Sequence, residues 1–151
     1  MSASITERPA PEPRSSYPHV LGITTRWMDN DVYGHVNNVV YYSYFDTVVN
    51  QYLIERGVLD IANSPVVGLV VETQCYYFSP IAFPSKVHAG LRVGHLGSSS
   101  VRYEIGLFAD DAKTSAARGH FVHVYVDRAT NRPVKLPAEL RRALEPLLKQ
   151  T

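Results

Sequence analysis

The residues of this chain that are best suited to chemistry lie within thirteen positions, from Arg26 to Asn38. Two carboxylates, Asp29 and Asp31, are followed there by a glycine, a histidine and two asparagines, and a long aromatic and aliphatic run comes next. This order predicts a strand end, a polar turn and then a buried helix. A carboxylate at the mouth of such a helix can attack a carbonyl or activate a water, and first-turn N–H groups can stabilise the resulting oxyanion. The turn therefore favours acyl chemistry.

Asp31 is the candidate catalytic carboxylate. It could attack a thioester carbonyl directly and form a mixed anhydride, or act as a general base on a water, and the residues do not separate these two routes. The oxyanion donor would be the backbone N–H near Asn38, and Gly34 would allow the backbone to approach the acyl group closely. The competing interpretation is structural, because an aspartate before a helix is commonly a cap or a turn former.

The other polar residues of the turn also have a structural interpretation beside the chemical one. Asp29 lies nearer the strand and could brace the turn. His35 could be a base, although a histidine beside a glycine turn often serves as a hydrogen-bonded scaffold. Asn37 is the expected N-cap of the helix, and Asn37 and Asn38 are expected to cap first and to contact substrate second.

Hydrophobic periodicity predicts the elements that position this turn. A strand is expected over residues 19–27, followed by a helix over 38–56 that ends at Gly57. The apolar residues of the helix go most of the way round, so we expect protein on most of its sides. Further strands are expected around residues 67–77, 87–93, 101–107 and 117–126, and a short helix from Pro137 to about residue 148. In the first of these strands the odd-numbered residues are expected to share one face. The fold class is α+β, with a strongly curved, mostly antiparallel sheet around one long helix.

Composition limits the classes of function. The 151 residues predict one domain, residues 18–151, behind a disordered proline-rich tail, residues 1–17. Fifteen Lys and Arg against fourteen Asp and Glu give no footprint of a nucleic-acid binder. No run approaches the length of a membrane span, and the first residues lack the apolar core of a signal peptide, so we expect a cytoplasmic location. Cys75 is the only cysteine and is interpreted as a buried thiol, and no motif indicates a metal or a cofactor.

The turn resembles the signature of the hotdog-fold acyl-CoA thioesterases, in the 4-hydroxybenzoyl-CoA thioesterase branch. The matching string is Asp29-x-Asp31-x-x-Gly34-His35-Val36-Asn37-Asn38, followed by Tyr41 and Tyr44-Phe45. A family-like order of motifs continues across almost the whole chain after the expected tail. The resemblance implies a hotdog fold, in which the antiparallel sheet wraps around the helix. It also implies a homodimer or homotetramer with active sites between subunits.

The resemblance assigns roles to individual residues. The catalytic aspartate of the family falls on Asp31, and a backbone N–H at about Asn38 would polarise the thioester carbonyl. The other branch of hotdog thioesterases carries its acid on the helix, where Asp46 is the rival candidate. The partner subunit would line the acyl pocket with the strand from Tyr76 to Ser79. The residues expected to contact substrate are Tyr33, Gly34, His35, Asn37, Tyr41, Tyr76, Phe78 and Ser79.

The function implied is hydrolysis of an acyl-CoA thioester to CoA and a free acid, without metal or redox cofactor. A thioester of acyl carrier protein is a second possible substrate. The tyrosines Tyr33, Tyr41 and Tyr76 could favour an aromatic acyl group or pack against a fatty chain. Two alternatives stay open: a non-catalytic protein that binds acyl-CoA or another small ligand on the same fold, and a hotdog dehydratase acting on 3-hydroxyacyl thioesters.

Overall fold

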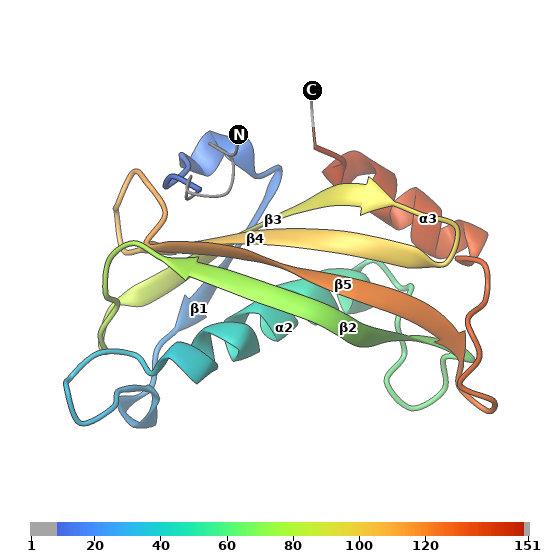
Figure 1. Ribbon diagram of the computed structural model, residues 1–151, viewed down its shortest axis with the longest axis horizontal. Coiled ribbons are helices and arrows are strands. Elements are labelled where there is room, and N and C mark those ends of the chain that lie inside the picture. Colours follow the sequence, from blue (N-terminus) through green and yellow to red (C-terminus); the bar gives the residue numbers. More distant parts are fainter. Residues whose placement is uncertain (1–8, 150–151) are drawn as a thin grey trace, which may run out of the picture.

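The computed structural model describes residues 9–149. A five-stranded antiparallel sheet, in the order β1-β3-β4-β5-β2, curves around the long helix α2 (Figure 1). The strands are β1 (His19–Thr24), β2 (Val66–Tyr77), β3 (Lys86–Leu96), β4 (Ser100–Ala109) and β5 (Ala117–Asp127). The helices are α2 (Asn38–Glu55), α3 (Ala138–Leu144) and the short 3-10 turns η1 (Arg14–Ser16), η2 (Trp27–Asp29) and η3 (Glu145–Leu147). This arrangement confirms the predicted hotdog fold.

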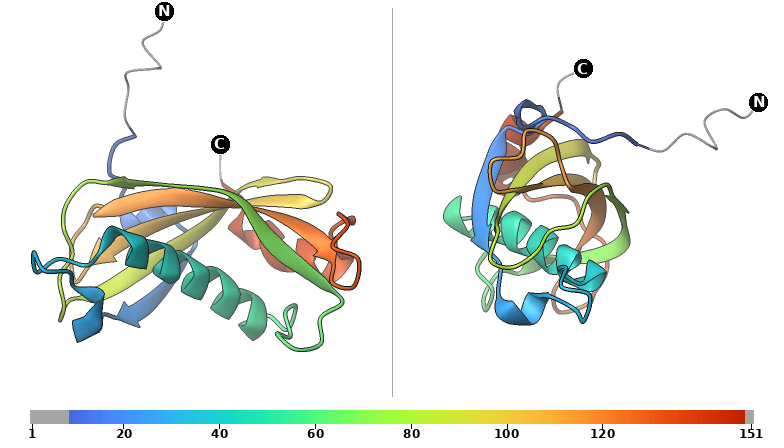
Figure 2. Two further views of the ribbon diagram at one scale, coloured as in Figure 1. Left: turned by 60° about the horizontal axis from the view of Figure 1, so that its bottom comes forward. Right: turned by 90° about the vertical axis from the view of Figure 1, so that its left-hand side faces the viewer.

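Helix α2 begins and ends where the local sequence predicts. The side chain of Asn37 caps it by accepting a hydrogen bond from the N–H of Val39 at 3.1 Å. Gly57 follows its end with a φ of +73°, in the left-handed region that glycine adopts freely. One face of the helix packs on the concave side of the sheet (Figure 2). The residues buried on that face are Tyr41, Tyr44, Phe45, Val48, Val49, Tyr52 and Leu53.

The opposite face of α2 is open in the single chain. Val39 and Asp46 on that face are exposed. The expectation of protein on most sides of the helix was therefore wrong for one chain by itself. The apolar residues that suggested a fully covered helix concentrate at i, i+3 and i+4 spacings, which is the pattern of a helix with a single buried stripe.

Close contact between helix and sheet depends on a glycine near the start of β5. The rings of Phe45 and Phe121 meet edge to face with centroids 5.6 Å apart. A Cβ at the neighbouring Gly119 would clash with the carbonyl oxygen of Gln74 and lie 2.8 Å from the ring of Phe45. A larger residue would therefore disturb both the pairing of β5 with β2 and the contact with α2. Further along, the hydroxyl of Tyr52 donates to the carbonyl of Ala143 at 2.6 Å, which ties the C-terminal half of α2 to α3.

Strand β2 changes face part-way along its length. Its register with β5 shifts between Val70 and Glu72, as in a β-bulge. Gly68 pairs with Tyr125, and Thr73 pairs with Phe121, so an even-numbered residue before the shift and an odd-numbered one after it face α2. The prediction that all odd-numbered residues of this strand share a face was therefore wrong for its first half, because a single extra residue reverses the alternation.

The described part of the expected tail is ordered. Residues 9–17, here called the N-terminal strap, lie on the face of the sheet away from α2 (Figure 2). The side chain of Tyr17 is buried in a groove over Gly90 and Gly106, where a Cβ at either position would lie 2.6 Å from its side chain. The prediction of disorder was wrong for these residues, and its remainder, residues 1–8, lies outside the described part.

Charged contacts hold the N-terminal strap in place. Glu12 accepts from Arg92 at 3.1 Å and from Arg118 at 3.2 Å. The guanidinium of Arg92 is only 3% exposed, and it also donates to Glu104 at 2.7 Å. The strap thus supplies part of the ion pairing that a buried arginine requires.

We predict that Tyr17→Ala lowers the free energy of unfolding by about 3 kcal/mol, because it empties the groove over the two glycines. Chemical denaturation would measure the loss. Tyr33→Ala is the matched control, since Tyr33 is 83% exposed and its removal should change stability by less than about 0.5 kcal/mol. Equal stabilities of the two variants would show that the strap contributes no packing.

Candidate active site

The polar turn between η2 and α2 is closed by backbone hydrogen bonds. The N–H of Asp31 donates to the carbonyl of His35 at 2.8 Å, and the N–H of Gly34 donates to the carbonyl of Asp31 at 3.0 Å. The N–H of Asn37 donates to the carbonyl of Asp29 at 2.8 Å. Gly34 has a φ of +82°, a conformation that residues with a Cβ rarely adopt. The turn therefore has one defined shape immediately before the helix.

Asp29 is the buried acid of the turn. Its Oδ2 accepts from the N–H of Arg26 at 2.9 Å and from the hydroxyl of Tyr44 at 2.8 Å. Its Oδ1 pairs with the guanidinium of Arg26 at 3.0 Å. Burial acts to raise the pKa of Asp29, but these hydrogen bonds and the charge of Arg26 outweigh burial and hold the pKa below its usual value. These contacts confirm that Asp29 braces the turn.

Asp31 is in a different environment, half-exposed to solvent. Its Oδ1 accepts from the N–H of Tyr33 at 2.9 Å, whereas Oδ2 accepts no hydrogen bond from any residue in the range 9–149. One oxygen of Asp31 is thus available to a ligand or a water, which is not true of Asp29.

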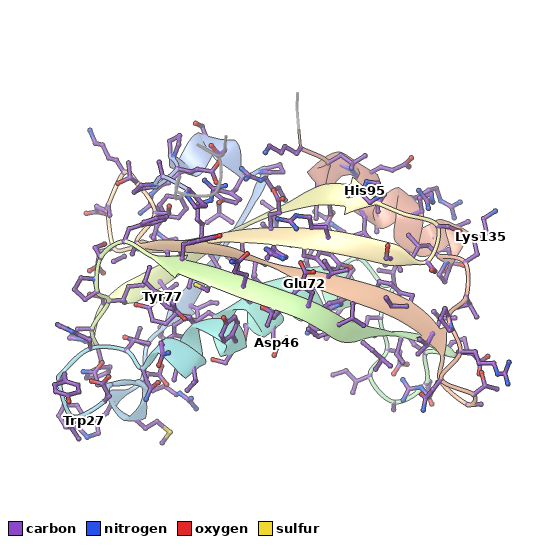
Figure 3. The ribbon with its side chains drawn as sticks, in the orientation of Figure 1. Trp27, Asp46, Glu72, Tyr77, His95 and Lys135 are labelled. Carbon is purple, nitrogen blue, oxygen red and sulfur yellow. The ribbon has the colours of Figure 1, made fainter. Side chains whose placement is uncertain are left out.

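The rival acid, Asp46, lies elsewhere. It projects from the middle of α2 on the exposed face of the helix (Figure 3). Partial desolvation by the surrounding protein raises its pKa. It lies eight residues, or about 12 Å of helix, beyond the residue at which α2 begins. Asp46 therefore does not share the turn with the first-turn N–H groups.

The N-terminus of α2 opens on a cavity of about 330 Å³. Its lining residues are His35, Val36, Asn38, Tyr41, Tyr77, Phe78, Ser79 and Pro80. The N–H of Asn38 donates to no acceptor within the described range, as is usual for the first turn of a helix. The cavity therefore combines an unpaired backbone donor with a mostly apolar and aromatic wall.

The structure brings only part of the predicted substrate set to this cavity. Four members of that set line it: His35, Tyr41, Phe78 and Ser79. Asn38, the predicted oxyanion donor, lines it as well. Tyr33 and Gly34 lie on the exposed outer side of the turn, and the side chain of Asn37 is used as the N-cap. Asp31 belongs to the turn but is not among the lining residues.

Tyr76 is not brought to the cavity. It lines a polar hollow on the other face of the sheet, together with Arg118 and His120. Its neighbour Tyr77 takes the expected place, since successive residues of a strand point to opposite faces. The hydroxyl of Tyr77 donates to the carbonyl of Asn38 at 3.1 Å, and its ring lies 4.9 Å from that of Tyr41 (Figure 3). The alternation of side chains along β2 could have predicted this placement, because the sequence puts Tyr77 on the same face as Cys75 and Tyr76 on the opposite one.

Neither a reactive thiol nor a metal cluster accompanies this cavity within the described residues. Cys75 is only half-buried, so the prediction of a buried thiol was wrong in degree. Partial burial still raises its pKa to about 11, so its thiol stays protonated at neutral pH. No group of three or more His, Cys, Asp or Glu side chains that could hold a metal ion occurs among residues 9–149. Within the same range no helix is long and apolar enough to cross a membrane.

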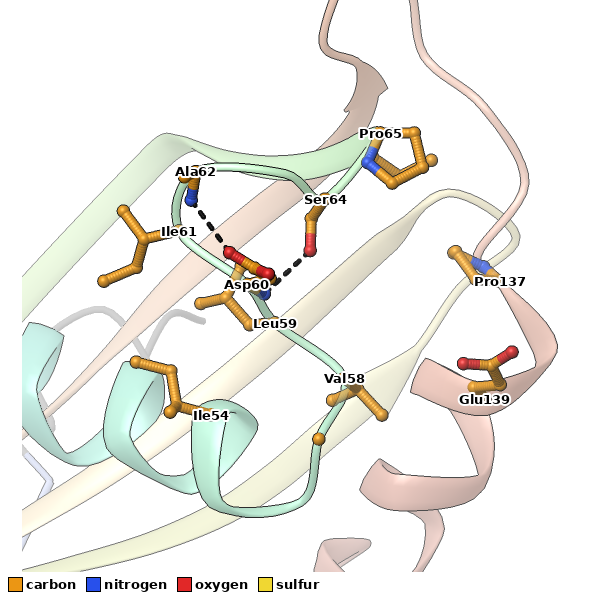
Figure 4. Close-up of a pocket in the computed structure, with 12 residues that line it drawn as sticks. Ile54, Val58, Leu59, Asp60, Ile61, Ala62, Ser64, Pro65, Pro137 and Glu139 are labelled. Atoms are coloured by element: carbon orange, nitrogen blue, oxygen red, sulfur yellow. Dashed lines mark hydrogen bonds between the residues drawn. The ribbon is translucent and has the colours of Figure 1, made fainter.

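A larger cavity, of about 870 Å³, lies beyond the C-terminal end of α2 (Figure 4). The loop of residues 57–65 forms most of its wall, and the rest comes from Ile54, Val66, Pro137 and Glu139. Asp60 stabilises this loop, because its Oδ1 accepts from the N–H of Ala62 at 3.1 Å and its own N–H donates to Ser64 Oγ at 2.8 Å. None of the residues in the polar turn lines it, so it carries no argument about the chemistry.

Several known proteins are similar to this chain. The PA5185 protein from Pseudomonas aeruginosa strain PAO1 is 54% identical and superimposes with a TM-score of 0.91, over 94% of this chain and 99% of that one. A thioesterase from Thermus thermophilus, complexed with coenzyme A and Zn, is 32% identical with a TM-score of 0.73, over 87% and 95% of the two chains. The uncharacterized protein YsmA of Bacillus subtilis (strain 168) is 24% identical over 95 residues. That alignment spans 63% of this chain and 64% of YsmA, just under two thirds of its length.

Residues 25–144 match the model of the Thioesterase-like superfamily. The matched range begins just before the polar turn and ends with α3, so it contains the turn, the cavity at the start of α2 and strands β2 to β5. Thioester hydrolysis, the enzyme class predicted from the sequence, is the class that this family and the similar thioesterase of known structure support. The chain belongs to the thioesterase-like superfamily.

Proposed function

We propose that this protein hydrolyses acyl-CoA thioesters to CoA and a free acid. The observation that carries the proposal is the unpaired N–H of Asn38, which opens on a cavity beside the turn that holds Asp31. The similar Thermus protein was solved in complex with coenzyme A, which supports the same substrate class here. A thioester of acyl carrier protein presents the same reacting group and is a second substrate of this kind.

The thioester carbonyl would sit at the start of α2. Its oxygen would accept a hydrogen bond from the N–H of Asn38, and the positive end of the helix dipole would stabilise the negative charge that develops there. Because a hydrogen bond to an oxyanion is stronger than one to a neutral carbonyl, this donor favours the transition state over the bound substrate.

Asp31 would supply the second half of the reaction. As a general base, its carboxylate takes a proton from a water whose oxygen attacks the carbonyl carbon; the C–S bond then breaks and the CoA thiolate takes up the proton. As a nucleophile, the carboxylate displaces CoA to form a mixed anhydride, which water hydrolyses to the free acid. The free Oδ2 of Asp31 suits both routes.

The remaining residues of the cavity would hold the thioester and the first part of the acyl group. The wall includes Tyr41, Phe78, Ser79 and His35. Tyr33, Gly34 and Asn37 shape the turn from its outer side. The position assigned to Tyr76 passes to Tyr77, which faces the cavity.

We further propose that two copies pair through β2. This strand lies at one edge of the sheet and has no strand on its outer side within the described chain. It is twelve residues long and carries exposed apolar side chains at Leu69, Val70 and Val71. A long exposed edge of this kind is a template for strand pairing, and antiparallel pairing of β2 with itself gives a closed twofold dimer.

Asp31→Asn should lower kcat for thiol release by at least about 100-fold, since the loss of a general base or a nucleophile typically costs that much. Stability and the affinity for CoA should stay near those of the parent, because Asp31 is half-exposed. Thiol release from short, long and aromatic acyl-CoAs measures this. An unchanged kcat would exclude Asp31 and direct attention to Asp46→Asn.

The same assay separates the alternative functions. A binding protein would saturate without releasing thiol, and a dehydratase would form an enoyl product without free thiol.

Asp29→Asn should give the opposite result, mainly a loss of stability. The two contacts with Arg26 depend on the negative charge of the carboxylate, so the free energy of unfolding should fall by about 2 kcal/mol at pH 7. Since the pKa of Asp29 is depressed on folding, its contribution is present above its unfolded pKa and is lost as the pH falls through the folded value. Below about pH 4 the parent should therefore lose stability more steeply than Asp29→Asn. If the free energy of unfolding changed with pH in the same way in the parent and in Asp29→Asn, the charge of Asp29 would not brace the turn.

Val71→Lys should convert a dimer into monomers, because it places a charge in the edge at which the β2 strands of the two copies would pair. Light scattering coupled to size-exclusion chromatography measures the mass. The matched control is Val20→Lys, an exposed valine on β1 at the opposite edge of the sheet. A monomeric parent, or a dimer that survives Val71→Lys, would rule out β2 as the interface.

A further inference from the structure

A further pocket lies along α2, between the C-terminal half of the helix and the first half of β2. Its volume is about 430 Å³, within the usual range of small-molecule sites. Its lining residues are Asn50, Leu53, Leu59, Ile61, Val67, Gly68, His123, Tyr125 and Arg128. Apolar walls with a few polar groups are the usual composition of a binding pocket.

His123 is the unusual residue of this pocket. It lies on β5, is only 5% exposed, and its Nε2 has no hydrogen-bond partner among the described residues. Its ring packs against Tyr103 and Phe121, with centroid distances of 5.0 and 5.4 Å. An unpaired buried polar atom costs free energy, so it requires an explanation, and a ligand that supplies the missing partner is one.

The neighbouring polar groups do not meet this need. The hydroxyls of Tyr103 and Tyr125 bond to each other at 2.6 Å. Burial lowers the pKa of His123 to about 4, so the imidazole is neutral at pH 7 and offers one N–H donor and one acceptor nitrogen. Such a group suits a hydroxyl or a carbonyl of the ligand.

A glycine keeps the pocket open on the side of β2. A Cβ at Gly68 would lie 2.9 Å from Nδ1 of His123 and 3.0 Å from the ring of Tyr125. Any larger residue would press on both side chains. The nitrogen of His123 nearest the wall formed by Val67 and Gly68 is thus Nδ1, and the unpaired Nε2 lies on the same edge of the ring, on the other side of Cε1.

We infer that this pocket binds the distal part of the acyl group and that His123 hydrogen-bonds to a hydroxyl or carbonyl carried there. The inference rests on the proposed function and on the paired β2 edges. Antiparallel pairing about the middle of β2 would bring Gly68 of one copy near the same strand's C-terminal end in the other copy, and hence near that copy's cavity at the start of α2. The acyl group would cross between subunits, and His123 would select acyl groups with a polar distal end.

The test compares a medium-chain acyl-CoA with its ω-hydroxy counterpart of the same chain length. The parent should prefer the hydroxylated substrate in kcat/KM by roughly tenfold, the size expected for one neutral hydrogen bond in a buried site. His123→Leu should abolish the preference, whereas His123→Gln, which keeps a hydrogen-bonding group, should retain part of it. His95→Leu is the matched control, because His95 is exposed and lies outside the pocket.

A binding measurement without turnover separates this inference from the proposed function. The free ω-hydroxy acid is added to the parent protein, and the ring nitrogen resonances of His123 are followed by NMR. Resonances that move with the hydroxy acid more than with the unsubstituted acid support the pocket, even if no acyl-CoA in the panel releases thiol and the proposed function fails. Resonances that stay in place overturn the inference, and so does an equal preference in the parent and in His123→Leu.

Discussion

The hydrogen bond between Asp29 and Tyr44 fixes the turn relative to the helix. Tyr44 belongs to the second turn of α2, and Asp29 lies at the start of the polar turn, so their 2.8 Å contact spans the loop that carries Asp31. The backbone of Asp29 accepts from Asn37, whose side chain in turn caps the helix. Because these contacts share Asp29 and Asn37, the start of α2 and the shape of the turn are set together. The free N–H of Asn38 therefore lies at a defined place.

Strand β2 forms part of the wall of two hollows along α2. Strand β2 ends at Tyr77, beside the first turn of α2, and the segment that follows it completes the wall of the cavity. The first half of the same strand borders the pocket that contains His123. A single edge strand thus touches both hollows, one at each end, and the β-bulge between them decides which side chains face α2. The arrangement concentrates the unusual features of the fold on one edge.

Local signals predicted the helix and the turn well. Asn37 as the cap, Gly57 after the helix end and Asp29 as a brace depend on residues close in sequence, so pattern and spacing were sufficient. Features that depend on contacts between residues far apart in the chain were not predicted. The pairing of Glu12 with Arg92 joins residues eighty positions apart, and nothing in a proline-rich segment indicates such a partner. The bulge in β2 is set by pairing with β5, and the unpaired nitrogen of His123 follows from packing that no sequence pattern describes.

The N-terminal strap changes where the folded unit starts. A sequence-based boundary at residue 18 would cut directly after Tyr17, leaving the groove over Gly90 and Gly106 open to solvent and Arg92 without Glu12. Truncation at that point would expose the two glycines of the groove and the otherwise buried guanidinium of Arg92 on the outer face of the sheet. Affinity tags and fusion partners are therefore better joined ahead of residue 9, and shortened versions of this protein that begin later are poor substitutes for the whole chain.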